Sequence, residues 1–238
     1  MAKLLLIETS SEVCSAAVSV DGQVVALVES PEALSHAAIL TLHIQDCLHQ
    51  AGMPIAALDA VAISKGPGAY TALRVGASVA KGICYALDKP LMAVDTLQAL
   101  AMASKNAETG VTAADLFAPM LDARRQEIWL ALYNHQLQEI CPAQALVLEN
   151  NSFENFLQEK TGSSTFARIV LSGNGANKAG IAQIPKGTVI SSIKKCSAAY
   201  LSELAEATFQ KADFQDVAYF EPFYMKPPNI TTPGKLPF

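Results

Sequence analysis

The amino-acid sequence predicts an α/β protein built from two lobes that share one order of elements. Three apolar, β-favouring segments come before the first helical segment. Short apolar segments then alternate with helical ones, which is typical of α/β lobes. The second half of the chain repeats this order more loosely. We therefore predict two βββαβαβα lobes, with a boundary near residues 105–115.

Turn and cap residues delimit the elements of the first half. Asp21-Gly22 separates two strand segments and is a strong hairpin signal. Gly52 ends the first helix, Gly66-Pro67-Gly68 forces a turn, and Thr71 is expected to cap the second helix. The expected strands are residues 3–9, 13–20, 24–29, 60–64 and 91–94, and the expected helices are residues 33–51, 71–87 and 96–104.

The second half is read in the same way. The polar stretch 106–114 is the best linker candidate, and Gly173-Asn174-Gly175 marks a turn after a strand. The expected strands are residues 116–121, 127–133, 144–148, 169–172 and 189–190, and the expected helices are residues 152–159 and 198–210. We divide the chain into a first lobe over 1–108, a second over 109–221 and a Pro-rich, extended tail over 222–238.

Composition excludes several classes of protein. With 51% hydrophobic residues the chain can bury a sizeable core, so general disorder is excluded. A net charge of −5 argues against stand-alone nucleic-acid binding. No run of 18 apolar residues occurs, so we expect no membrane span. Five scattered cysteines and the absence of an export signal favour reduced thiols and a cytoplasmic location.

Three short motifs could hold a ligand; the first two also have a simpler structural explanation, and the third is a weak signal. Glu8-Thr9-Ser10 at the end of the first strand could hold a cation or phosphate, or could be an edge acid with turn-forming hydroxyls. Gly66 and Gly68 before a helix could cradle an anion, or could form a tight turn; this is not a Walker loop. Gly173 and Gly175 lack the third glycine of a dinucleotide site.

The histidines argue against a metal centre. His36 and His43 share a face of the first predicted helix, but seven residues separate them by about 10 Å. One ion with bonds of about 2 Å cannot reach both. No Gly-x-Ser-x-Gly elbow occurs, and nothing favours a Cys–His pair. We therefore predict neither a catalytic residue nor a metal site.

Both long helices of the first lobe are apolar on more than one side. Such helices are either deeply buried or pack against a partner. On the first helix we place Ala37 and Leu40 on the core side. On the second, Val79 and Ile83 belong to one apolar face, and Leu73, Ala77 and Cys84 form a second apolar stripe. The remaining side of each helix is the candidate partner interface, formed by Ser35, Ile39, Leu42, Asp46, Leu73, Ala77, Ala80 and Cys84.

Six blocks of sequence, in order from the first strand almost to the C-terminus, carry a resemblance to a known family. They are LLIETS at 5–10, SH at 35–36, GPGAYTALRVG at 66–76, VDTLQAL at 94–100, DARRQEIW at 122–129 and EPFYMK at 221–226. Together they closely resemble the bacterial TsaB family, also called YeaZ. The resemblance implies a shortened form of the two-lobed ASKHA fold, the architecture of actin, Hsp70 and sugar kinases.

The resemblance also implies a role. TsaB proteins are non-catalytic members of the machinery that forms threonylcarbamoyladenosine beside the tRNA anticodon. They pair with the paralogue TsaD through first-lobe helices, and the ATPase TsaE joins the assembly. Without a partner, the same apolar helices should pair with each other, so we expect a symmetric homodimer of the isolated chain. We also expect contact with tRNA only through partners, and no required cofactor.

At most weak ATP or ADP binding is expected, at a vestigial nucleotide loop. Its residues would be Glu8, Thr9, Ser10, Gly66, Gly68, Gly173 and Gly175. The sequence departs from the family at Glu8, where an aspartate is common, and at Ala72, where a glycine is usual. Both departures weaken the case for a working nucleotide site. The alternatives are an independent ASKHA-type ATP-binding enzyme, such as a small-molecule kinase, and a metallopeptidase-like hydrolase.

Overall fold

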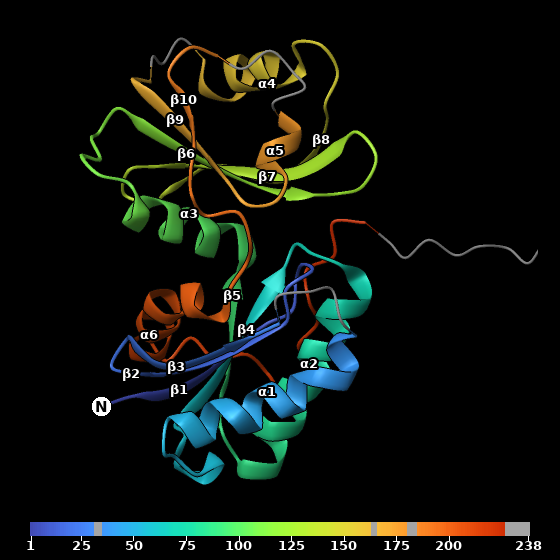
Figure 1. Ribbon diagram of the computed structural model, residues 1–238, viewed down its shortest axis with the longest axis vertical. Coiled ribbons are helices and arrows are strands. Elements are labelled where there is room, and N and C mark those ends of the chain that lie inside the picture. Colours follow the sequence, from blue (N-terminus) through green and yellow to red (C-terminus); the bar gives the residue numbers. More distant parts are fainter. Residues whose placement is uncertain (31–34, 163–165, 180–184, 227–238) are drawn as a thin grey trace, which may run out of the picture.

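The computed structural model describes residues 1–30, 35–162, 166–179 and 185–226 of the chain (Figure 1). Two five-stranded sheets form two lobes, one above the other in Figure 1. The first lobe contains β1 (Lys3–Glu8), β2 (Ser15–Val20), β3 (Gln23–Glu29), α1 (His36–Gln50), the 3-10 turn η1 (Ile55–Ala57), β4 (Ala60–Gly66), α2 (Tyr70–Leu87), β5 (Leu91–Asp95) and α3 (Thr96–Ala107). The remaining elements are β6 (Asp115–Asp122), β7 (Glu127–Asn134), β8 (Glu139–Val147), α4 (Ser152–Thr161), β9 (Arg168–Ser172), α5 (Ala176–Ala179), β10 (Thr188–Ile190), the 3-10 turn η2 (Ala198–Leu201) and α6 (Ser202–Gln210).

The two sheets have the same topology. Their strand orders are β3-β2-β1-β4-β5 and β8-β7-β6-β9-β10. In each sheet the first three strands are antiparallel, and the fourth and fifth run parallel to the first. The predicted βββαβαβα order of elements is therefore confirmed along both halves of the chain.

Helices cover both faces of each sheet. In the first lobe, α1 and α2 pack on one face of the sheet, and η2 and α6 pack on the other. In the second lobe, α4 and α5 cover the outer face. The face that remains packs on α3, which therefore lies between the two sheets (Figure 1).

The end of the predicted second lobe packs elsewhere. Ala198, Leu201 and Ala205 are fully buried against Leu4 and Leu6 of β1. The final helix thus belongs to the core of the first lobe, although we placed it with residues 109–221. Sequence order alone could not reveal this return, because the apolar side of a helix does not identify the sheet it will cover.

Several element boundaries also differ from those predicted. The first helix starts at His36, and residues 33 and 34 of its expected range lie outside the described residues. Ala69, and not Thr71, is the N-cap of α2. Strand β8 is five residues longer at its start than predicted. The predicted final helix is a 3-10 turn followed by α6.

The start of the predicted tail is docked on the protein. The Phe223 N–H donates a hydrogen bond of 2.7 Å to the Lys65 carbonyl. The Tyr224 ring lies against Tyr70, with 4.6 Å between ring centroids. Lys226 then forms an ion pair with Glu127 of β7. Residues 221–226, which we call the strap, thus contact both lobes; the tail over 227–238 lies outside the described residues.

Within the described ranges, no helix combines the length and the apolar character needed to cross a bilayer.

Candidate functional site

The motif that ends β1 is buried. Glu8 is 1% exposed, and its Oε1 accepts hydrogen bonds from the Ser10 N–H and the Ser64 hydroxyl. Burial raises the pKa of the Glu8 carboxyl above its ordinary value of 4.5, although these hydrogen bonds act in the opposite direction. Thr9 and Ser10 are buried beside it. The carboxyl therefore faces protein groups, not an open cleft.

The two glycines after β4 serve close packing. A Cβ on Gly68 would collide with the backbone of Ser10, and a Cβ on Gly66 would collide with the Phe223 carbonyl. Gly66 also has a φ of +111°, which side-chain-bearing residues rarely adopt. The Ala69 N–H donates 2.7 Å to the Ser10 carbonyl. The structure thus brings together the two motifs that we assigned to a nucleotide loop, and it joins them directly to each other.

The glycines after β9 occupy the equivalent place in the second lobe. A Cβ on Gly173 would collide with the Met120 carbonyl, and Gly175 lies against the backbone of Leu121. Gly173 also has a positive φ, of +84°. The Gly175 N–H donates 3.0 Å to the Met120 carbonyl. Each Gly-x-Gly turn therefore packs the start of a helix against the end of the first strand of its own lobe, or against the residues just after that strand. For Gly66 and Gly68 this matches the tight-turn alternative.

The two lobes meet at these turns. The Asn174 side chain accepts from the Asp122 N–H at 2.8 Å and donates to Glu12, in the β1–β2 loop, at 2.7 Å. Asn174 thereby links the second-lobe turn to the loop that follows Glu8. The seven residues of the predicted nucleotide loop lie on the two sides of this junction, five in the first lobe and two in the second. In both glycine turns, backbone atoms of the protein itself fill the space beside the glycines.

The predicted interface is wrong on α2. Leu73 and Ala80 are fully buried, and Ala77 and Cys84 are at most 5% exposed. Ala77, Ala80 and Cys84 belong to the core beneath α1 and α2. These four residues face the sheet because β4 supports α2 from that side. The apolar stripe that we assigned to the partner interface is therefore a buried face of α2.

On α1 the predicted residues reach the surface. Leu42 is 55% exposed, Ser35 and Asp46 are exposed, and Ile39 is half-buried against the core. Ala37, which we expected in the core, is exposed. The predicted partner surface is therefore available on this helix and is absent from the predicted side of α2.

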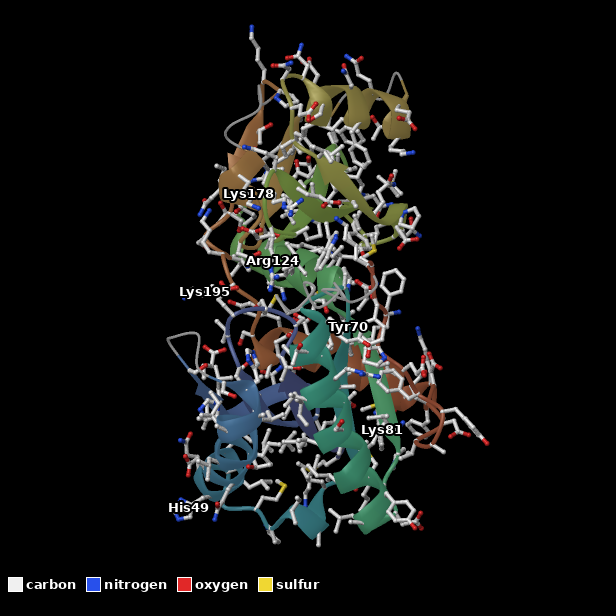
Figure 2. The ribbon with its side chains drawn as sticks, turned by 90° about the vertical axis from the view of Figure 1, so that its right-hand side faces the viewer. His49, Tyr70, Lys81, Arg124, Lys178 and Lys195 are labelled. Carbon is white, nitrogen blue, oxygen red and sulfur yellow. The ribbon has the colours of Figure 1, made fainter. Side chains whose placement is uncertain are left out.

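An apolar groove of about 480 Å³ runs between the two helices. On the α2 side it is lined by half-buried Val79 and Ile83. The sequence analysis did not predict that these two side chains reach the surface. Further along the outward side of α2, Gly82 is exposed and has open space where a Cβ would stand. The remaining lining residues are Thr41, Ile44, Gln45, Leu48, His49, Met53 and Ile55. Figure 2 places His49 of α1 toward one end of the molecule, with Tyr70 and Lys81 along α2.

The thiols are unsuited to nucleophilic chemistry. All five cysteines are free and buried. Burial raises the pKa of Cys14, Cys47 and Cys84 to about 11, so each stays protonated at neutral pH. In the described part of the chain, no three His, Cys, Asp or Glu side chains gather in a way that could hold a metal ion.

Comparison with known proteins identifies the family. The family model described as "TsaD: tRNA N6-adenosine threonylcarbamoyltransferase" matches residues 30–236. The chain belongs to this family. Among curated relatives, the tRNA threonylcarbamoyladenosine biosynthesis protein TsaB of Haemophilus influenzae is 27% identical over 98% of this chain and 97% of its own length. Escherichia coli TsaB is 34% identical over 55% of this chain and 54% of its own length. These matches confirm the resemblance to TsaB (YeaZ).

Solved structures agree with the TsaB assignment. YeaZ from Pseudomonas aeruginosa superimposes with a TM-score of 0.78 at 25% identity, covering 94% of this chain and all of that one. The activator of the 2-hydroxyisocaproyl-CoA dehydratase from Clostridium difficile, with bound ADPNP, gives a TM-score of 0.53 at 10% identity over 90% of this chain and 98% of its own. The second likeness concerns the fold alone. The predicted two-lobed, ASKHA-like fold is confirmed.

Proposed function

We propose that this chain is a non-catalytic subunit of the machinery that forms threonylcarbamoyladenosine in tRNA, and that it acts by pairing with a TsaD-like paralogue. Its membership of the family and its likeness to TsaB along nearly the whole chain support the pathway. Because this pathway acts on tRNA, we place the chain in the cytoplasm. A TsaE-like ATPase is the further expected partner, and tRNA is reached through the partners.

The apolar groove between α1 and α2 is the observation that supports pairing. An exposed apolar surface of this kind on a single chain marks an interaction site. Gly82 on the outward side of α2 leaves room for another helix to approach closely, and exposed Leu42 adds apolar area on α1. The groove therefore fits a helix from a partner chain.

A TsaD-like paralogue suits this groove because it shares ancestry with the chain. A tRNA N6-adenosine threonylcarbamoyltransferase of Clostridium perfringens is 34% identical over 111 residues, 40% of this chain and 33% of that protein. Two related chains can pair their equivalent helices in the way that a symmetric dimer pairs identical ones. Without the paralogue, two copies of this chain would use the same surface, which gives a homodimer.

The non-catalytic assignment is supported by the side chains themselves. His36, His43 and His49 all lie on α1, at spacings other than the i, i+4 pair that binds one ion. The buried cysteines carry protonated thiols. The Gly66 turn donates its Ala69 N–H to Ser10, so this amide is not available to a phosphate. We infer that no cofactor is required and that ATP or ADP binds weakly at most.

The test is light scattering after size-exclusion chromatography, with the chain alone and then mixed with the TsaD protein of the same organism. We expect a homodimer that exchanges into a one-to-one heterodimer. Leu42→Glu and Gly82→Leu should abolish the heterodimer while the chain stays folded, because both positions are exposed. Val147→Glu is the matched control: this valine is 49% exposed, but it lies on β8 of the second lobe.

Three results would overturn the proposal. The first is that the chain does not bind TsaD. The second is a complex that survives both Leu42→Glu and Gly82→Leu, the two variants on the exposed surfaces of α1 and α2. The third is tight binding of ATP with magnesium by the isolated chain in calorimetry, which would favour the alternative of an independent ATP-binding enzyme.

A further inference from the structure

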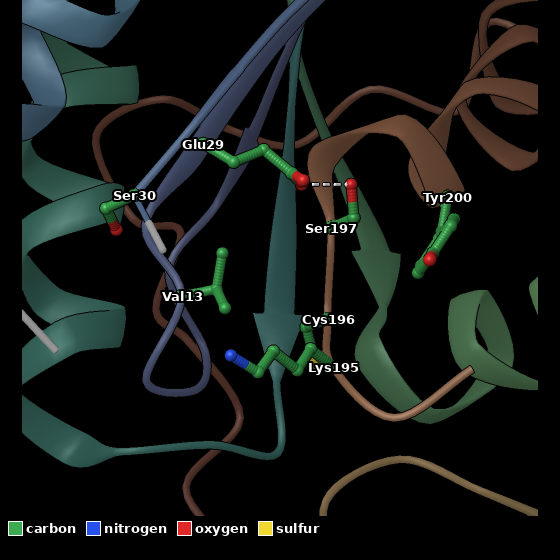
Figure 3. A pocket seen from close by; sticks show the side chains of 7 residues that line it. All are labelled: Val13, Glu29, Ser30, Lys195, Cys196, Ser197 and Tyr200. Carbon is green, nitrogen blue, oxygen red and sulfur yellow. Dashed lines mark hydrogen bonds between the residues drawn. The ribbon is translucent and has the colours of Figure 1, made fainter. Parts of the chain in front are cut away.

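A second pocket, of about 420 Å³, lies where the segment after β10 crosses from the second lobe to the first (Figure 3). Its volume is within the range of small-molecule sites. It is lined from the first lobe by Val13 of the β1–β2 loop, Glu29 at the end of β3 and Ser30 after it. The other side is formed by Lys195, Cys196 and Ser197 of the crossing segment and Tyr200 of η2. The proposed pairing through α1 and α2 makes no use of this pocket.

The pocket carries two opposite charges that retain bonding capacity. Oε1 of Glu29 accepts a hydrogen bond of 2.5 Å from the Ser197 hydroxyl, and in the described part of the chain its second oxygen makes none. Lys195 is exposed and pairs with no acid within the described ranges, Glu29 included. In the view of Figure 3, the lysine nitrogen and the Glu29 carboxylate lie on different sides of Val13.

Hydrogen bonds hold in place the wall that carries Glu29 and the segment that follows Lys195. The Ser30 hydroxyl accepts from the Cys14 N–H at 3.2 Å and donates to the Cys14 carbonyl at 3.3 Å. Ser197 accepts from the Ala199 N–H while it donates to Glu29. The Ala198 N–H donates 2.8 Å to the Ser15 hydroxyl. A pocket organised before binding loses less free energy to ordering when a ligand enters.

We propose that this pocket binds a small α-amino acid as its zwitterion, with the ammonium group at Glu29 and the carboxylate at Lys195. A ligand with only a negative charge would meet the Glu29 carboxylate, and a ligand with only a positive charge would meet the Lys195 ammonium. A zwitterion satisfies both groups at once. Val13 and the Tyr200 ring provide the apolar wall for its side chain.

The inference goes beyond the proposed function and does not depend on a partner chain. Only the choice of probe rests on that function: L-threonine is used because the product of the pathway carries a threonyl group. L-Valine is the second probe, since it has the shape of threonine with a methyl group in place of the hydroxyl.

The experiment is isothermal titration calorimetry of the full chain with both amino acids. We expect millimolar binding of each. Glu29→Gln keeps an acceptor for Ser197, and Lys195→Met keeps the length of the side chain. Each substitution should weaken binding about tenfold or more, the loss expected for one charge-assisted hydrogen bond. Glu149→Gln and Lys211→Met, both at exposed positions outside the pocket, are the matched controls and should bind as wild type.

Modified ligands separate the two charges. L-Threonine methyl ester lacks the carboxylate and N-acetyl-L-threonine lacks the ammonium, so we expect both to bind at least tenfold more weakly. An unchanged thermal midpoint of the two pocket variants shows that they are folded. The proposal is wrong if neither amino acid binds, if both pocket variants bind as wild type, or if the ester and the N-acetyl compound bind as well as threonine. Light scattering tests partner binding separately, so its outcome can support or contradict the proposed function whatever the result of the amino-acid titrations.

Discussion

The two lobes share one topology but differ in the helices that cover their outer faces. In the first lobe, α1 and α2 have 15 and 18 residues. Of the corresponding helices, α4 has 10 residues, and α5 has 4 within the described residues, which end at 179 and resume at 185. The sheets and the Gly-x-Gly turns are nearly equivalent, and the helices are not. Backbone pairing and tight turns set the strand order in both lobes, and this order does not depend on the length of the covering helices. The apolar groove, where we propose that a partner binds, lies between the long helices of the first lobe.

The largest effects should come from the buried side of those helices. Leu73 of α2 and Phe153 of α4 are fully buried, each against its own sheet. Leu73→Ala should lower the free energy of unfolding by about 2–5 kcal/mol, and Phe153→Ala by about 3–5 kcal/mol. Leu42→Ala, on the exposed side of α1, should change it by less than about 0.5 kcal/mol. Urea denaturation measures all three, and a Leu73 variant as stable as wild type would contradict the orientation of α2.

This contrast between buried and exposed helix sides shows which features could be predicted from the sequence. Turn signals and the alternation of strands with helices predicted both sheets, because Asp21-Gly22 and the Gly-x-Gly turns act locally. The orientation of α2 could not be predicted, since Ala72, Gly76, Val79 and Ile83 form as plausible a core stripe as Leu73 and its neighbours. Only the position of β4 decides between them. The pocket lined by Glu29 and Lys195 could not be predicted from the sequence either, because the fold brings together residues that are distant along the chain.

The next effect tests the equivalence of the two glycine turns. Gly68→Ala and Gly175→Ala should each cost about 1–3 kcal/mol, because in both the new Cβ meets backbone that cannot move aside easily. Gly82→Ala is the control: its Cβ has open space, so the chain should gain up to about 1 kcal/mol from better helix propensity. Denaturation midpoints measure these changes. If only one of the two turns is sensitive, the symmetry between the lobes does not extend to their turns.

The lobes should also differ in their response to pH. Burial raises the pKa of Asp115 in β6, but hydrogen bonds from Arg168 and Thr112 outweigh it and hold the pKa below its ordinary 3.8. Its contribution to stability is therefore present at neutral pH and is lost as pH falls through the folded-state pKa. Asp115→Asn should cost about 1.5–3 kcal/mol at pH 7, and this difference should shrink in acid.

Glu8 in β1 should behave in the opposite way. Because burial raises its pKa, its contribution is present at low pH and is lost as pH rises through the folded-state pKa. Glu8→Gln keeps an acceptor for Ser10 and Ser64 and removes the buried charge. The variant should gain stability relative to wild type as pH increases above about 4.5. Thermal unfolding of both variants across pH measures this, and parallel profiles for Asp115→Asn and Glu8→Gln would contradict it.

The smallest effect concerns the strap that joins the lobes. Lys226 and Glu127 form an ion pair that is partly open to solvent. Lys226→Met should lower stability by at most about 1 kcal/mol, and less in high salt. A double-mutant cycle with Glu127→Gln measures the pair itself. A coupling well above this value would mean that the strap holds the lobes more firmly than a surface contact does.

The return of η2 and α6 to the first sheet has a consequence for synthesis on the ribosome. One face of that sheet, which includes Leu4, Leu6 and Ala62, is covered by Ala198, Leu201 and Ala205. The N-terminal half therefore leaves the ribosome before the residues that cover this apolar face have been made. The face stays exposed until nearly the whole chain has been translated. Nascent chains that stop before about residue 205 should bind chaperones, and the first lobe should not become protease-resistant before the second has been made.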